Sequence, residues 1–176
     1  QLNNENGIFI GLFLAEGHCH NGHITITNNN KNIQDFVKNW FDNHAISYCE
    51  KSKTNTNGWT TSTITGNSTI LSKLLTKMVG HKAENKHIPD EAYIAPECFI
   101  QGLLNGYYSG DGTVSKNSID VGSASKRLIE GISMLCSRLG IFGKVSMSQL
   151  KSNNFKTKNI KPTHRMSIRA QWGKLF

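Results

Sequence analysis

The sequence predicts an α+β protein made of two pseudo-symmetric halves, and three observations support this prediction. A glycine-spaced helical segment that ends in an acidic residue occurs twice. Hydrophobic positions in the two halves coincide when one half is shifted along the other, and helical and alternating segments follow in the same order in both. With 176 residues, of which 37% are hydrophobic, the chain is long enough to bury one good core or two small halves that share one.

The clearest helical segment is residues 102–112, GLLNGYYSGDG. Gly102, Gly106 and Gly110 recur every four residues, so they lie along one stripe of a helix. Each glycine costs a helix roughly 1 kcal/mol relative to alanine. We therefore expect the stripe to pack very closely against a second backbone. Asp111 follows the stripe at the end of the helix.

The same pattern occurs earlier, in residues 7–17, GIFIGLFLAEG. Two glycines and an alanine form its stripe of small residues, and Glu16 takes the terminal acidic position. Two such helices packed stripe to stripe would bring Glu16 and Asp111 together at adjacent helix C-termini.

This is an unfavourable place for two anions. Each carboxylate would meet the negative end of a helix dipole, and each would raise the pKa of the other. A divalent cation relieves the conflict, because Mg²⁺ binds through one or two carboxylates together with waters and substrate phosphates. The matched pair therefore predicts a metal site on a two-fold axis. The alternative is two ordinary helix ends that happen to be acidic.

Several elements are predicted between the two glycine-spaced helices. Residues 23–27 alternate polar and apolar side chains, which is typical of a half-buried strand. Residues 31–44 and 68–79 have the hydrophobic spacing of amphipathic helices. Residues 46–51 and 59–66 predict a hairpin around a turn rich in Asn, Thr and Gly.

The second half repeats the first after a polar, proline-stopped connection at residues 82–89. Adding 95 to a residue number carries the first glycine stripe onto the second, and no gap is needed from residue 7 to residue 46. Residues 144–148 and 165–169 predict the second hairpin, with a longer connection than in the first half. Residues 172–176 would begin the equivalent of the helix at 68–79, so we expect the second repeat to be truncated.

Basic residues outnumber acidic ones and are concentrated near the C-terminal end. Twenty Lys and Arg against 12 Asp and Glu give a net charge of +8, and the pI is near 9.4. This balance favours a polyanionic partner. Residues 144–176 contain eight Lys and Arg but no Asp or Glu. A solvated surface is the alternative explanation of this block.

The cysteines indicate a reduced, intracellular protein of unspecified compartment. They show neither CxxC pairing nor zinc-like spacing with the seven histidines. No apolar run approaches the roughly 18 residues that a membrane span needs, so we expect no membrane partner. Because the chain begins with Gln1 and stops abruptly at Phe176, we expect it to be a piece of something longer.

Residues 9–17 (FIGLFLAEG) and 104–112 (LNGYYSGDG) resemble the two signature motifs of LAGLIDADG homing endonucleases. The similarity is closest to the intein-encoded, dodecapeptide subtype. It covers essentially the whole chain, because both motifs, their spacing and the helix-strand-helix-hairpin order between them fit. One motif would be a weak signal, whereas two with a fitting repeat are a strong one.

The resemblance implies two αββαββα repeats, at residues 1–97 and 98–176, whose antiparallel strands form a saddle over double-stranded DNA. It also implies site-specific cleavage of both DNA strands by metal-dependent hydrolysis, with Mg²⁺ as cofactor and Mn²⁺ able to substitute. The expected form is a pseudo-symmetric monomer that promotes homing of an intein or intron.

Carried over by position, the metal-binding and catalytic acids are Glu16 and Asp111, and the adjoining Ala15 and Gly110 belong to the metal site. Inteins of this family also carry a basic residue in a Lys-Xaa-Ile-Pro segment ahead of the second motif. The segment KHIP matches it and makes Lys86 the third catalytic residue, which would stabilise developing charge or organise water. The alternative role for Lys86 is a solvated linker lysine.

Residues expected to face DNA lie on the strand faces that point away from the core. A β-ribbon fits the major groove, where Arg pairs with guanine and Ser or Thr adapts to several bases. The predicted sheet contacts are Thr25, Thr63, Thr65, Lys144, Ser146, Ser148, Arg165, Ser167 and Arg169. Lys151, Lys156, Lys158 and Lys161 are predicted to contact phosphates.

The chain departs from the family pattern in three ways. Asn105 replaces a small or apolar residue, Glu16 replaces an aspartate, and the end of the second repeat is absent with its expected basic residue. No splicing segments are visible at either end, so we interpret the chain as an endonuclease region. The competing hypothesis is a catalytically impaired LAGLIDADG module that binds DNA or RNA as a regulator or splicing cofactor.

Overall fold

The computed structural model describes residues 1–148 and 162–169. The first half contains α1 (Asn4–Glu16), β1 (Gly17–His20), β2 (His23–Thr27), α2 (Lys31–Asn43), β3 (Tyr48–Thr54), β4 (Thr60–Asn67) and α3 (Thr69–Val79). Two short 3-10 helices follow, η1 (Ala83–Asn85) and η2 (Asp90–Ile94). The second half contains α4 (Glu97–Asp111), β5 (Thr113–Val114), β6 (Ser118–Ser123), α5 (Lys126–Arg138), β7 (Gly143–Ser148) and β8 (Thr163–Arg169).

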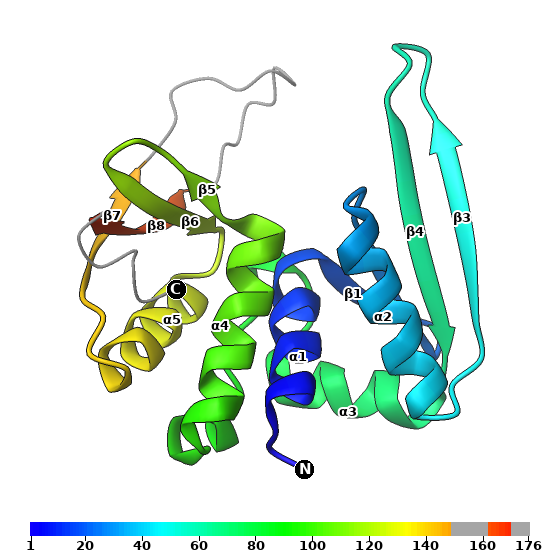
Figure 1. Cartoon of the computed structure of the whole chain (residues 1–176), viewed down its shortest axis with the longest axis horizontal. Helices are drawn as coiled ribbons and strands as arrows, with labels where there is room; N and C mark the ends of the chain where they lie inside the picture. Colours follow the sequence, from blue (N-terminus) through cyan, green and yellow to red (C-terminus); the bar gives the residue numbers. More distant parts are fainter. Residues whose placement is uncertain (149–161, 170–176) are drawn as a thin grey trace.

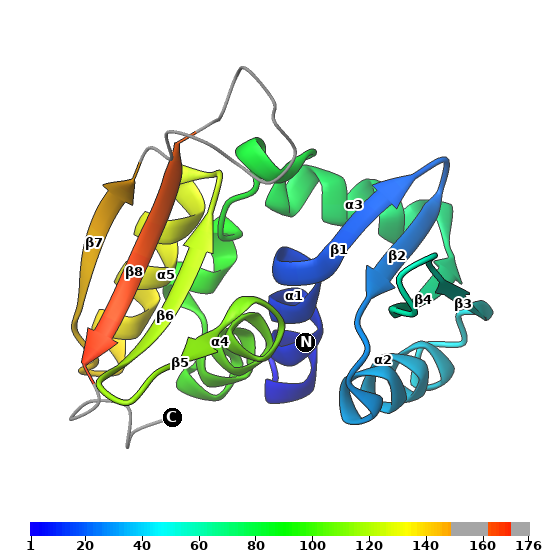
Figure 2. The same cartoon turned by 90° about the horizontal axis from the view of Figure 1, so that it is seen from above.

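The predicted α+β class and its repeated helix-strand-strand order are confirmed. The strands form two antiparallel four-stranded sheets, ordered β1-β2-β4-β3 and β5-β6-β8-β7, so the second sheet repeats the topology of the first. Helices α1 and α4 lie side by side in the middle, with one sheet on each side (Figure 1). The view from above shows both sheets flanking this helix pair (Figure 2). The predicted helix at 172–176 lies outside the described residues.

Several element boundaries differ from the sequence prediction for local reasons. The predicted strand at 46–51 begins only at Tyr48, because the Ile46 amide still donates to the Phe41 carbonyl and completes the end of α2. Strand β1 was missed. It forms a hairpin with β2 through Asn21 and Gly22, whose φ angles of 49° and 81° suit a two-residue hairpin turn.

The glycine stripes of α1 and α4 pack backbone against backbone, as predicted. A methyl group added at Gly11 would lie 2.7 Å from the Tyr107 amide nitrogen, and one added at Gly106 would lie 2.9 Å from the Leu12 amide nitrogen. Both obstacles are main-chain atoms, which cannot move aside as a flexible side chain would. The two helices are therefore held at a separation that only glycine permits.

Aromatic and aliphatic side chains extend the core from this helix pair toward each sheet. On the first side Phe9 of α1 stacks on Trp40 of α2 with ring centroids 3.6 Å apart, and the Trp40 indole N–H donates to Asn6 Oδ1 at 2.9 Å. On the second side Tyr107 and Leu103 of α4 are fully buried. Within the described residues, no helix is both long and apolar enough to cross a bilayer.

Replacement of Gly106 by alanine is expected to destabilise the protein. Alanine raises helix propensity by roughly 1 kcal/mol, but overpacking costs typically 1–3 kcal/mol, and here the clash is with backbone. The matched control is Asn105→Ala, an exposed position of the same helix that gains propensity without a clash. Urea denaturation should show a lower midpoint for Gly106→Ala than for Asn105→Ala. Equal midpoints would contradict the close-packing interpretation.

Candidate functional site

The two acidic residues named from the sequence lie where α1 and α4 end. A methyl group added at Gly110 would lie 2.5 Å from Ala15 Cβ and 3.2 Å from Glu16 Cγ. The residue before Asp111 thus touches both Ala15 and Glu16. The structure therefore brings all four predicted metal-site residues to one place, at the carbonyl ends of two parallel helices.

The electrostatics of the pair follow from this position. The pKa of Asp111 is raised from 3.8 to about 6 as the net result of three causes: partial burial raises it most, the Glu16 carboxylate also raises it, and the Lys86 ammonium lowers it. Burial also raises the pKa of Glu16, again against the effect of Lys86. Asp111 nevertheless keeps an exposed surface, so a ligand can reach it. The site is one in which negative charge is crowded and only partly balanced.

Lys86 lies against the end of α1 and is half-buried, so it is not a solvated linker lysine. Its ammonium group donates to the carbonyls of Phe13 at 3.2 Å, Leu14 at 2.7 Å and Gly17 at 2.9 Å. The Phe13 carbonyl also accepts from the Gly17 amide at the end of the helix, and a cation at a helix C-terminus interacts favourably with the helix dipole. Burial lowers the pKa of Lys86, whereas the Asp111 and Glu16 carboxylates raise it.

The backbone that carries Lys86 is fixed by the second half of the chain. The Ser125 hydroxyl donates to the Lys86 carbonyl at 2.6 Å and accepts from the Leu128 amide at 3.2 Å, so the cap of α5 holds the connecting segment. Ile88 is buried next to Gly131 of α5. Lys86 therefore joins one half through its side chain and the other through its main chain.

The donor set suits a cation that takes few protein ligands. In residues 1–148 and 162–169, no group of three or more His, Cys, Asp and Glu side chains is placed to share a metal ion. Two carboxylates with unfavourable mutual repulsion match Mg²⁺, which keeps several waters and binds through one or two carboxylates plus phosphates. Glu16 and Asp111 are the residues that would hold it.

The first sheet has one polar face, on which Thr25, Thr63 and Thr65 lie together. The register pairs Thr25 with Thr65 and Thr27 with Thr63, and their hydroxyls are 3.4 and 3.2 Å apart. The register adds residues to this face that were not among the predicted DNA contacts. His18, His20, Cys49, Lys51 and Lys53 were left out because strand β1 was not predicted and β3 was misplaced. The others lie on β2 and β4 and are His23, Thr27, Thr61 and Asn67.

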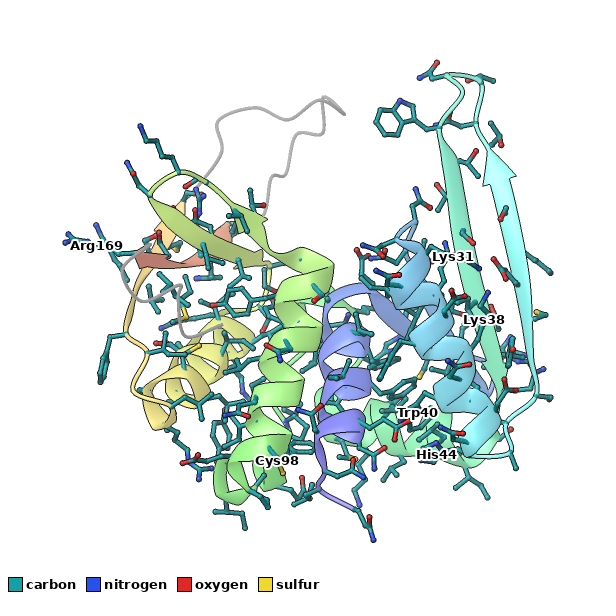
Figure 3. The ribbon with its side chains drawn as sticks, in the orientation of Figure 1. Lys31, Lys38, Trp40, His44, Cys98 and Arg169 are labelled. Atoms are coloured by element: carbon teal, nitrogen blue, oxygen red, sulfur yellow. The ribbon has the colours of Figure 1, made fainter. Side chains whose placement is uncertain are left out.

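The second sheet places the other predicted contacts on one face. The register aligns Lys144 with Ser167 and Ser146 with Arg165. The same face carries Ser148 and Arg169, and Arg169 lies near the outer end of the sheet (Figure 3). Lys151, Lys156, Lys158 and Lys161 lie outside the described residues. A role of any of these side chains in DNA binding stays a prediction.

An unpredicted ion pair occupies the face of the second sheet. Arg165 Nη2 lies 3.1 Å from Asp120 Oδ2, and the Ser118 hydroxyl donates to the same oxygen at 2.7 Å. Burial opposes ionisation of Asp120, but hydrogen bonds from Ser167 and Ser118 and the charge of Arg165 lower its pKa. The ion pair restrains the orientation of the Arg165 side chain, which its position in the sequence did not indicate.

Comparisons with known proteins agree with this geometry. Residues 99–169 match the family model of the LAGLIDADG-like domain. Mesophilic variants of the homing endonuclease I-DmoI superpose with a TM-score of 0.69 at 13% identity, covering 99% of this chain and 93% of that one. The N-terminal LAGLIDADG domain of DUF199/WhiA superposes with a TM-score of 0.64 at 10% identity, covering 97% and 78%. The chain has the LAGLIDADG fold, and its second half contains a LAGLIDADG-like domain.

Curated relatives match the chain over only part of their length. The DNA-directed RNA polymerase subunit Rpo1C of Methanocaldococcus jannaschii is 34% identical over 145 residues, which is 81% of this chain and 16% of the relative. A probable translation initiation factor IF-2 of the same organism is 42% identical over 66 residues, which is 36% of this chain and 6% of the relative. The chain thus spans less than a fifth of either protein.

Two substitutions should move the pKa of Asp111 in opposite directions. Glu16→Gln removes a neighbouring negative charge and should lower that pKa below about 6, whereas Lys86→Met removes a positive charge and should raise it. The carboxyl carbon of Asp111, followed by NMR through a pH titration of the metal-free protein, reports both shifts. Asp90→Asn, outside the site, should leave the titration unchanged. Shifts of the same sign would contradict the arrangement.

Asp111→Asn should stabilise the metal-free protein at pH 7. Because the pKa of Asp111 is higher in the folded protein than its ordinary 3.8, the folded state binds this proton more tightly. This contribution to stability is complete below pH 4 and is lost as the pH rises through about 6. Thermal denaturation in a chelator should show a gain over wild type at pH 7 that disappears near pH 4. A gain that is independent of pH would point to another cause.

Proposed function

We propose that the protein is a site-specific endonuclease that cleaves both strands of DNA by metal-dependent hydrolysis. The observation that carries this proposal is the meeting of Glu16 and Asp111 at the contact between α1 and α4, with Lys86 beside them. The site lies between two sheets whose polar faces carry the basic and hydroxyl side chains described above. One chain supplies both halves, so a monomer is expected to act on an asymmetric target.

Related structures support the choice of substrate and cofactor. I-DmoI, which shares the fold, has been solved in complex with its target DNA, and its structures include Mn, Mg and Ca. The net charge of +8 on the present chain suits the same kind of polyanion. We infer that double-stranded DNA lies across both sheets and that Mg²⁺ is the usual metal, with Mn²⁺ as a substitute.

The side chains present can perform most tasks that phosphodiester hydrolysis needs. A divalent cation, when bound, neutralises phosphate charge and makes a water molecule acidic enough to attack. Glu16 and Asp111 would bind that cation and relieve their own repulsion. Lys86, held by three carbonyls, keeps a positive charge next to the reacting phosphate and stabilises the charge that develops in the transition state.

The curated relatives support an origin as a mobile intein element. They are an RNA polymerase subunit, translation initiation factors and a DNA polymerase, and the chain matches only 16% to 4% of their length. A shared segment in proteins of such different function is what insertion of one element into several host genes would produce. We propose that the chain promotes homing of such an element and acts inside the cell, on genomic DNA.

A second candidate function is nucleic-acid binding without cleavage. The similarity to the LAGLIDADG domain of DUF199/WhiA favours it, because the same fold there belongs to a protein other than the homing endonuclease I-DmoI. The retention of an acid at the end of both α1 and α4 favours cleavage instead.

Asp111→Asn is expected to abolish cleavage while DNA affinity stays within about twofold of wild type. The substrate is supercoiled plasmid carrying the junction that would form if the coding sequence of the element were removed from its reading frame. Wild type should give linear plasmid with Mg²⁺ and none with a chelator, and Asp90→Asn should cut like wild type. Linear product from Asp111→Asn at the normal rate would refute the metal assignment. A gel shift by wild type without cutting would favour the binding function.

A further inference from the structure

A basic cleft lies beside Lys86, between the edge strand β1 and the C-terminal part of α3. It consists of two adjoining hollows of about 520 and 420 Å³. Lys86 lines the larger hollow, and α3 contacts β1 on one side of the central helix pair (Figure 2). The residues that line both hollows, and so join them, are Cys19, His20, Thr76 and His81.

Lysine is the only fully charged residue type that lines the cleft. Lys73 and Lys77 are one turn apart on α3, and Lys82 follows on the rim. No Asp or Glu lines either hollow. Among the ion pairs of the described part of the chain, none involves these three lysines, whereas Lys31 and Lys38 of α2 both have acidic partners. Lys73, Lys77 and Lys82 therefore have no counter-charge within the cleft, and an anion is the ligand that would supply one.

The histidines of the cleft do not favour a metal ion. No cluster of three or more metal-binding side chains occurs in residues 1–148 and 162–169. Lys73, Lys77 and Lys82, which have no acidic partner, would also repel a cation. The chemistry of the lining thus fits a phosphate group, for which lysine ammonium and imidazole N–H groups are donors.

The backbone of Lys82 is strained at the rim of the cleft. Its φ of 67° and ψ of 154° fall in a region that essentially only glycine adopts without cost. Glycine at this position would relieve the strain, but the chain has a lysine there. Because backbone strain of this kind clusters at functional sites, we infer that the Lys82 side chain serves the cleft.

The cleft is continuous with the polar face of the first sheet. His18 and His20 line the larger hollow, and the register places His18 beside Thr25 on that face. Lys86 forms the wall shared with the carboxylate site. A strand of DNA lying on the sheet would therefore reach the cleft and the carboxylates within the same stretch of backbone.

We propose that the cleft between β1 and α3 binds a backbone phosphate of the DNA strand, next to the phosphate that lies at Glu16 and Asp111. This inference rests on the proposed function, because it names a second contact of the same substrate. Contacts to phosphate fix the position of DNA without reading its sequence. We expect this phosphate site in the first repeat alone. In the second repeat, Thr113 and Ser115 stand at the positions equivalent to His18 and His20 when 95 is added to the residue number.

The first test measures the salt dependence of binding for the variant Lys73→Met/Lys77→Met. The probe is a duplex with the same junction sequence as the cleavage substrate, titrated at several KCl concentrations. Each lost phosphate contact should lower the slope of log K against log[salt] by roughly 1 and weaken binding about five- to tenfold at low salt. The matched control is Lys38→Met/Arg127→Met, which removes two charges from α2 and α5. Lys38 lies on α2 (Figure 3) and pairs with Glu50, whose side chain the register directs away from the polar face.

The second test uses Lys82→Gly to separate strain from binding. This variant should melt at a higher temperature than wild type, because glycine relieves the backbone, and should bind the duplex more weakly, because the cation is lost. A purely structural role for Lys82 would leave affinity unchanged and would overturn its assignment to the phosphate site.

The third test follows acetylation of individual lysines by mass spectrometry. The duplex should protect Lys73, Lys77 and Lys82 from acetic anhydride at least severalfold and leave Lys126 of α5 reactive. Equal reactivity of these lysines with and without duplex would overturn the proposal. Protection by inorganic phosphate but not by the duplex, at the same ionic strength, would also overturn it, because the cleft would then bind free phosphate and not DNA. If the lysines are protected but plasmid stays uncut, the phosphate site stands and the endonuclease proposal fails. If plasmid is cut while the lysines stay reactive, the endonuclease proposal stands and the phosphate site fails.

Discussion

The contact between the glycine stripes of α1 and α4 is the constraint on which the rest of the structure depends. Backbone lies directly on backbone there, since methyl groups at Gly11 and Gly106 would meet main-chain nitrogens. This separation sets the distance between the two halves, each of which packs its own helix and sheet outward from the pair. It also carries the ends of both helices to the same place, so that Glu16 and Asp111 become neighbours without any loop having to position them.

The electrostatic repulsion between Glu16 and Asp111 is partly offset by Lys86, which belongs to the connecting segment. Two carboxylates and two carbonyl-rich helix ends concentrate negative charge, and Lys86 places its ammonium group among the carbonyls that end α1. The balance is incomplete, because the pKa of Asp111 remains raised to about 6. A fully compensated pair would have little to gain from a cation. The partial compensation leaves a net negative charge at the site, which is the charge that the proposed metal ion would balance.

Much of the fold was predictable because periodic patterns carry it. The glycine spacing predicted the helix contact, and the internal repeat predicted that both halves share one topology. Very short elements and contacts between residues far apart in the sequence were not predictable. Strand β1 has only four residues, and its one local signal was the Asn21-Gly22 turn. The Arg165–Asp120 pair depends on a diagonal contact between strands, and the carbonyl partners of Lys86 are about seventy positions away in the chain. No local pattern encodes such contacts.

The hydrogen bond from Ser125 to the main chain of Lys86 has a consequence for a newly made chain. The first half leaves the ribosome before α4 and α5 exist, so at that moment the segment with Lys86 has no anchor and Glu16 has no acidic counterpart. The arrangement of Glu16, Asp111 and Lys86 is complete only after the last helix of the described chain has docked. For the proposed nuclease, synthesis order would thus act as a safeguard, because a partly made or broken polypeptide does not bring these three residues together.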